Sequence, residues 1–211
     1  MPNWCYMECT FYADDENKGE LLRLHKTLSA IMQTPSEVEN GFESGCLSKV
    51  AINHGVDLQK ISCRGTIELL GDYEPGSSFF ALEAETAWAP TDDLWEAVIS
   101  QYKGVSFVYI AEEPGMGIFV NTDTEGIYFP CNYLLEIYSE ELVPKGWHID
   151  SDKPDYIDIR EYFGSIEELM DYCTAYMGRK FSTIEELQGY LSDIFDELGN
   201  SFANIREFAA E

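Results

Sequence analysis

Apolar and polar residues alternate in several short stretches of the chain, a pattern typical of half-buried β-strands. In residues 3–12 the odd-numbered positions from 5 to 11 are apolar, and Tyr6, Glu8 and Thr10 lie between them. The same alternation, or a continuous apolar run, predicts further strands over residues 61–69, 78–87, 105–111, 118–120 and 127–129. Turn residues separate the first two of these, so they are expected to pair as a hairpin.

Apolar residues spaced three and four apart predict two helices in the same region. The first covers residues 16–33, and its buried stripe consists of Leu21, Leu24, Leu28 and Ile31. The second covers residues 92–103, where Thr91 is the expected N-cap and Gly104 the expected residue after the last turn. A short helix or strand near 46–53 interrupts the long connection after the first helix. This order of elements is that of a split βαβ, ferredoxin-like α+β fold, a sheet with two helices on one face.

The last third of the chain shows a different pattern. Residues 139–155 contain prolines and glycines and are interpreted as a connector. An approximate repeat follows, and each copy carries a capping box, formed by Ser165 with Glu168 and by Thr183 with Glu186. Helices are therefore predicted over residues 166–177 and 184–198, stopped by Gly178 and Gly199.

These patterns divide the chain into a ferredoxin-like α+β domain over residues 1–138, the connector, and a C-terminal helical extension over residues 156–211. We interpret the extension as a helical hairpin that packs on the sheet domain. The alternative interpretation of the extension is a partner-binding appendage.

Composition narrows the class of protein. The 211 residues include 45% hydrophobic side chains, enough to form a core, so a disordered acidic tail is excluded. No apolar stretch approaches the roughly 18 residues that a membrane span needs. The N-terminus shows no basic start, apolar run or cleavage site, and a cytoplasmic location is therefore expected.

Candidate chemistry is sparse in the sequence. The six cysteines contain no C-x-x-C pair, so buried structural thiols are favoured over a zinc site. The histidines, His25, His54 and His148, lie in no recognisable catalytic motif, and neither a phosphate loop nor a dinucleotide-binding fingerprint occurs. We therefore predict a non-enzymatic protein without metal or cofactor. An uncharacterised enzyme stays open as an alternative, without support from a motif.

Two segments together resemble a known family. The first is Met1-Pro-Asn-Trp-Cys followed by a strand. The second begins at Thr86-Ala-Trp-Ala-Pro90 and continues through a helix to Phe107-Val-Tyr-Ile-Ala-Glu-Glu-Pro-Gly-Met-Gly-Ile-Phe119 and Gly126. Over about residues 1–130 this combination resembles the Api-ninety-two-like family. The resemblance implies a ferredoxin-like N-terminal domain and a phage or plasmid setting, and it implies no activity.

The balance of charge is the most unusual property of the chain. Acidic residues number 39 and basic residues 13, which gives a formal net charge of −26. Residues 65–144 hold 15 of the acids and a single base, Lys103. Because a phosphate binder needs a basic surface, direct binding of nucleic acid is not expected.

The acidic block suggests mimicry of a nucleic acid. In this hypothesis a basic nucleic-acid-binding host protein, such as a restriction or CRISPR-type nuclease, binds the carboxylates and is inhibited. The candidate partner-binding residues are Glu68, Asp72, Glu74, Glu83, Glu85, Asp92, Asp93 and Glu96. The alternative is a small soluble binding module whose acidity is only a solubility or organism-wide trait.

Overall fold

The computed structural model describes residues 3–34, 45–140, 144–148, 156–195, 198 and 200–210. Its contacts divide the chain into two compact units, one that ends at Asp123 and one that spans Thr124–Ala210. Each unit contains its own antiparallel sheet and its own helices, so the chain has a mixed α and β architecture. Within the described ranges, no helix has both the length and the apolar character needed to cross a bilayer.

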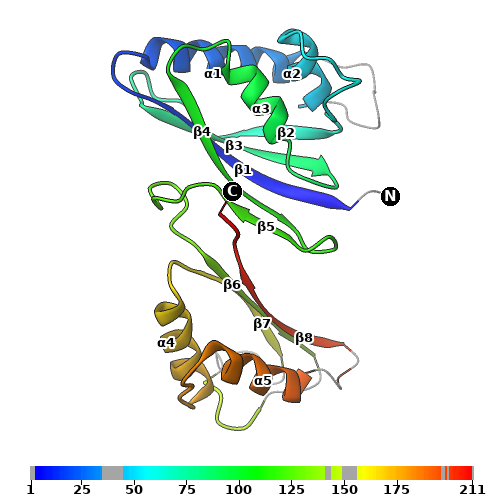
Figure 1. The fold of residues 1–211 in the computed structure, drawn as a ribbon, viewed down its shortest axis with the longest axis vertical. Helices are drawn as coiled ribbons and strands as arrows, with labels where there is room; N and C mark the ends of the chain where they lie inside the picture. Colours follow the sequence, from blue (N-terminus) through cyan, green and yellow to red (C-terminus); the bar gives the residue numbers. More distant parts are fainter. Residues whose placement is uncertain are drawn as a thin grey trace. The chain divides into compact units, whose positions relative to one another are not determined.

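The first unit is built on a five-stranded sheet in the order β2-β3-β1-β4-β5, in which every neighbouring pair is antiparallel. Three helices cover one face of this sheet (Figure 1). The elements are β1 (Trp4–Ala13), α1 (Lys18–Gln33), α2 (Leu47–Asn53), β2 (Gly65–Leu70), β3 (Phe79–Ala87), α3 (Asp92–Ile99), β4 (Val105–Glu113) and β5 (Ile118–Asn121).

The core of the first unit follows the alternation in the sequence. Cys5, Cys9 and Phe11 of β1 are fully buried beneath the helices, and the predicted stripe of α1 is buried with them. The Phe11 ring stacks on Phe80 with 5.2 Å between ring centroids, and it meets Trp95 of α3 edge to face at the same distance. Among the described residues, no helix of this unit lies on the other face of the sheet, and the polar positions of the strands point there.

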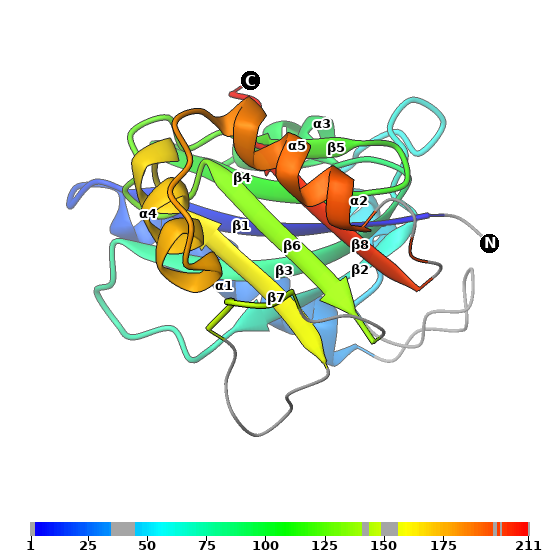
Figure 2. The same cartoon turned by 90° about the horizontal axis from the view of Figure 1, so that it is seen from below.

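The second unit contains a three-stranded sheet in the order β7-β6-β8. Figure 2 shows helices α4 and α5 together in front of these strands, and their apolar faces form one core with the sheet. The elements are β6 (Tyr133–Ser139), β7 (Ile157–Phe163), α4 (Ile166–Met177), α5 (Ile184–Phe195) and β8 (Ser201–Glu207). One half of each predicted capping box is formed: Ser165 Oγ accepts from Glu168 N at 3.2 Å, and Thr183 Oγ1 accepts from Glu186 N at 3.2 Å. The two glutamates accept from the residue before each cap, Gly164 N and Ser182 N, at 2.9 Å.

The structure corrects several boundaries. The predicted division at residue 138 lies inside the second unit, because β6 pairs with β7 and β8. The predicted extension over 156–211 is therefore more than a helical hairpin, since it contributes two strands as well as two helices. Residues 127–129 form no strand. The predicted connector over 139–155 and the stop at Gly199 fall largely or wholly outside the described residues.

Thr91 does not cap α3 as predicted. It occupies the N-cap position, but its side chain makes no capping hydrogen bond. Its hydroxyl oxygen is buried without a hydrogen-bond partner in the described part of the chain.

Candidate functional site

The eight predicted partner-binding residues occupy three places in the first unit. Glu68, Glu83 and Glu85 lie on the strands, where all three side chains are exposed. Asp72 and Glu74 lie in the connection between β2 and β3. The remaining three, Asp92, Asp93 and Glu96, lie on α3, in the layer that covers the opposite face of the sheet. The structure therefore does not bring the eight residues together on one surface.

Three glutamates form a row across the face of the five-stranded sheet that lies opposite helices α1, α2 and α3. We call this face the helix-free face. Glu83 of β3 lies directly opposite Glu68 of β2 and directly opposite Glu8 of β1. Neighbouring strands are about 4.8 Å apart, so the three Cα atoms span only about 10 Å. Glu8 was not among the predicted site residues, although its position in the alternation of β1 placed it on this face. We call Glu8, Glu68, Glu83 and Glu85 the acidic face.

A second row adds an aromatic ring to the acidic face. Tyr6 of β1 lies directly opposite Glu85 of β3 on one side and Glu112 of β4 on the other. The tyrosine is 59% exposed, and its hydroxyl has no hydrogen-bond partner among the described residues. A large exposed ring is thus held between carboxylates by the register of three strands.

The acidic face has no balancing cations on its own strands. Strands β1 to β5 contain no lysine or arginine. The ion pairs that the structure shows in the first unit belong to its helices and loops: Lys18 with Asp15 at 2.7 Å, Arg23 with Glu20 at 2.5 Å and Lys60 with Asp57 at 3.7 Å. Within the described ranges, the exposed glutamates of the acidic face have no ion-pair partner.

This arrangement is electrostatically unfavourable for the isolated protein. Burial, and secondarily the nearby carboxylate of Glu83, raise the pKa of the Glu8 carboxyl. Like charges directly opposite each other on neighbouring strands destabilise a sheet. A cationic ligand would relieve this repulsion.

Trp88 is a second exposed aromatic residue of the first unit. It follows the end of β3, is 49% exposed and has a φ of 77°, the only positive φ at a described residue other than glycine. For a bulky side chain this left-handed conformation is unfavourable by about 1–2 kcal/mol. Its backbone N–H donates to the carbonyl of Asn3 at 2.9 Å, which holds the conformation. The structure thus leaves about half of the Trp88 surface exposed.

His25, His54 and Cys5 have structural surroundings. His25 stacks on Tyr73, and burial lowers the pKa of its imidazole. His54 is buried, with Nδ1 2.7 Å from the Val50 carbonyl and Nε2 3.0 Å from the Tyr102 hydroxyl. Burial raises the pKa of the Cys5 thiol to about 11. In the described part of the chain, no three His, Cys, Asp or Glu side chains form a group that could hold a metal ion.

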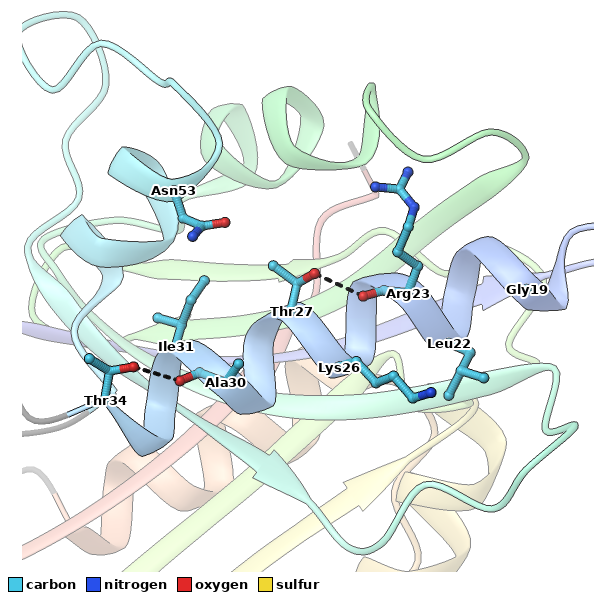
Figure 3. Close-up of a pocket in the computed structure, with 9 residues that line it drawn as sticks. All are labelled: Gly19, Leu22, Arg23, Lys26, Thr27, Ala30, Ile31, Thr34 and Asn53. Atoms are coloured by element: carbon cyan, nitrogen blue, oxygen red, sulfur yellow. Dashed lines mark hydrogen bonds between the residues drawn. The ribbon is translucent and has the colours of Figure 1, made fainter.

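The helix layer contains a separate groove of about 700 Å³ along α1 (Figure 3). It is lined by Gly19, Leu22, Arg23, Lys26, Thr27, Ala30, Ile31, Thr34 and Asn53. The polar groups of Arg23 and the two threonines are already used within the unit. Arg23 donates to Glu20 and to the carbonyl of Gln101, and the threonine hydroxyls donate to carbonyls of the same helix. The groove is therefore a weaker candidate than the acidic face.

Comparison of the chain with models of protein families, with curated proteins and with solved structures gave no match.

Proposed function

We propose that this protein binds a basic, nucleic-acid-handling host protein through its acidic face and inhibits that protein by nucleic-acid mimicry. The single observation that supports the proposal is the cross-strand row of Glu68, Glu83 and Glu8 on a five-stranded sheet whose strands contain no cation. The proposal differs from the sequence-based hypothesis in one respect. It assigns binding to the strand glutamates and not to the acids of α3.

The spacing of the carboxylates supports this choice. Successive glutamates are about 4.8 Å apart across the strands, and Glu83 and Glu85 are about 6.7 Å apart along β3. Each strand of double-helical DNA carries one negative charge for about every 3.4 Å along the helix axis. The acidic face therefore presents a line of charge that is less dense than DNA but of the same sign and order of spacing. Lysines and arginines that contact phosphates could contact these carboxylates instead.

The proposal extends to the fold of the first unit and to the genomic setting of the protein. The order β2-β3-β1-β4, with α1 and α3 on one face, supports a ferredoxin-like assignment for the first unit, in which α2 and β5 are additions. We further propose membership of the Api-ninety-two-like family, on the sequence segments quoted above. A phage or plasmid setting would provide a reason to inhibit a restriction or CRISPR-type nuclease.

The test compares two triple charge reversals. The first variant is Glu68→Lys, Glu83→Lys and Glu85→Lys, and the matched control is Asp92→Lys, Asp93→Lys and Glu96→Lys on the opposite side of the sheet. Both variants change the net charge by the same amount. Each is expressed in restriction-proficient and CRISPR-proficient cells, and the transformation efficiency of a targeted plasmid is measured.

The wild-type protein and the α3 control are expected to protect the plasmid, and the acidic-face variant is expected to lose protection. Circular dichroism establishes that all three proteins are folded. Equal protection by both variants would contradict the assignment to the acidic face, and absence of protection by the wild-type protein against these nuclease classes would contradict the proposed inhibition.

A further inference from the structure

Three arginines of this chain each lie over a tyrosine ring and pair with a glutamate. In the first unit, the guanidinium carbon of Arg23 lies 4.0 Å from the centroid of the Tyr102 ring. The same guanidinium forms an ion pair with Glu20 at 2.5 Å. A planar cation thus stacks on a tyrosine face while a neighbouring carboxylate accepts its N–H groups, a combination that suits arginine in particular.

The second unit repeats this grouping of arginine, tyrosine and glutamate. Arg179 lies 4.7 Å from the Tyr190 centroid and 3.2 Å from Glu186, and Arg160 lies 5.7 Å from the Tyr162 centroid and pairs with Glu136. None of the lysines within the described ranges lies over an aromatic ring. Arginine is therefore the cation that this chain places on tyrosine beside glutamate.

The acidic face presents the same two groups without the arginine. Tyr6 and Glu85 lie directly opposite each other on β1 and β3, where side chains of a cross-strand pair are about 5 Å apart at Cβ. The Tyr6 ring is 59% exposed, and Glu85 is exposed as well. The adjacent pair, Glu8 and Glu83, provides further carboxylates within reach of a long side chain.

We infer that Tyr6 and Glu85 form a subsite for an arginine side chain of the partner, so that the acidic face selects arginine-rich over lysine-rich surfaces. This inference rests on the proposed function and names the chemistry of the partner. The guanidinium stacks on the Tyr6 ring and donates to the Glu85 carboxylate. A lysine ammonium is compact and strongly hydrated, so it gains attraction from the carboxylates but little from the ring.

The inference is tested with two synthetic peptides of equal length and charge, hexa-arginine and hexa-lysine, titrated against the full chain at low ionic strength by isothermal calorimetry. An exposed cation–π contact corresponds to an affinity ratio of about two- to five-fold for each arginine so placed. The wild-type protein is therefore expected to bind hexa-arginine at least about two-fold more tightly than hexa-lysine.

Variants at Tyr6 identify the source of the preference. Tyr6→Ala is expected to bring the ratio of affinities close to one, and Tyr6→Phe, which retains the ring, is expected to preserve it. Ile52→Ala serves as the matched control, because Ile52 is also 59% exposed but lies on α2, in the helix layer. This control is expected to leave both affinities unchanged.

The outcomes separate the inference from the proposed function. If both peptides bind equally and the triple reversal of Glu68, Glu83 and Glu85 abolishes both, the acidic face binds cations and the arginine subsite is wrong. A preference for arginine that survives Tyr6→Ala also overturns the subsite. If neither peptide binds, or if binding is insensitive to the triple reversal, the proposed function fails together with the subsite.

Discussion

Repulsion between Glu8 and Glu83 should reduce the stability of the protein, and removing either charge should therefore stabilise it. The two residues lie directly opposite each other on β1 and β3. At 5 Å, two unit charges repel by about 0.8 kcal/mol at the permittivity of water and by about 3 kcal/mol at an effective permittivity of 20. Because Glu83 is exposed and its side chain can turn away, the lower end applies. We expect about 0.5–1 kcal/mol of coupling, the upper part of the range of about 0.2–1 kcal/mol measured for cross-strand pairs.

A double-mutant cycle measures this coupling. Glu8→Gln, Glu83→Gln and the double variant are unfolded in urea at pH 7, and the free energies of unfolding are compared. Each single variant is expected to be more stable than the wild-type protein, and the double variant less stable than the sum of the two gains. Glu85→Gln is the matched control, since Glu85 lies on the same face of β3 but opposite Thr66 and Tyr6. Its effect should add to that of Glu8→Gln.

The dependence of the stability on pH and salt tests whether the coupling between Glu8 and Glu83 is a repulsion. The pKa of Glu8 is raised in the folded state, so this state binds the proton more readily than the unfolded chain does. The contribution of Glu8 to stability is therefore most favourable below the unfolded value near 4.5 and is lost as the pH rises through the raised folded pKa. The coupling should shrink at about 0.5 M salt, where screening acts over a few ångströms. Strictly additive single variants, or a coupling unaffected by salt, would refute the electrostatic argument.

Three further predictions concern other parts of the structure. Burial lowers the pKa of His25 in the folded state, so its contribution to stability should be lost as the pH falls from about 6.5 through the folded value. Wild-type and His25→Gln proteins are unfolded in urea between about pH 7.5 and 5.5, and the free energy of unfolding should fall less in the variant. Burial raises the pKa of Cys5 to about 11 and that of Cys173 to about 12, so a thiol reagent should modify the half-buried Cys131 before either of them, as peptide mass analysis would show. Thr91→Val should raise the free energy of unfolding by about 1 kcal/mol, because the buried hydroxyl has no hydrogen-bond partner in the described residues, and a decrease would show that the hydroxyl is satisfied.

Much of the first unit could be predicted from the sequence because its strands alternate regularly. The alternation of β1 separates buried Cys5 and Phe11 from Tyr6 and Glu8, and the structure has the same separation. The register between strands could not be predicted in this way, since alternation fixes the face of a residue but not its neighbour on the next strand. The row of three glutamates depends on that register.

One signal in the sequence could have improved the choice of site residues. If two helices cover one face of the sheet, the polar positions of the strands belong to the other face, and the acids of the helix α3 cannot join them. That reasoning favours Glu8 over Asp92, Asp93 and Glu96. The eight candidates followed instead from their closeness along the chain, which says little about position in a sheet.

The second unit was harder to predict because its strands are separated by long segments. Ile157 and Ile159 alternate with Asp158 and Arg160, which is a strand signal of β7. The predicted helical extension over residues 156–211 did not include this strand. β8 carries weaker alternation, and its partner β6 lies about 60 residues earlier in the chain, so only the three-dimensional pairing identifies both as one sheet.

The central claim, that Glu8, Glu68, Glu83 and Glu85 act as one cation-binding surface, is tested most directly by nuclear magnetic resonance. The ¹⁵N-labelled protein is titrated with hexa-arginine, and chemical-shift changes are mapped on the sequence. Changes concentrated on the outward-facing positions of β1, β2 and β3 are the predicted result. Changes that are spread evenly over acids of both units, or that centre on α3, would contradict the claim.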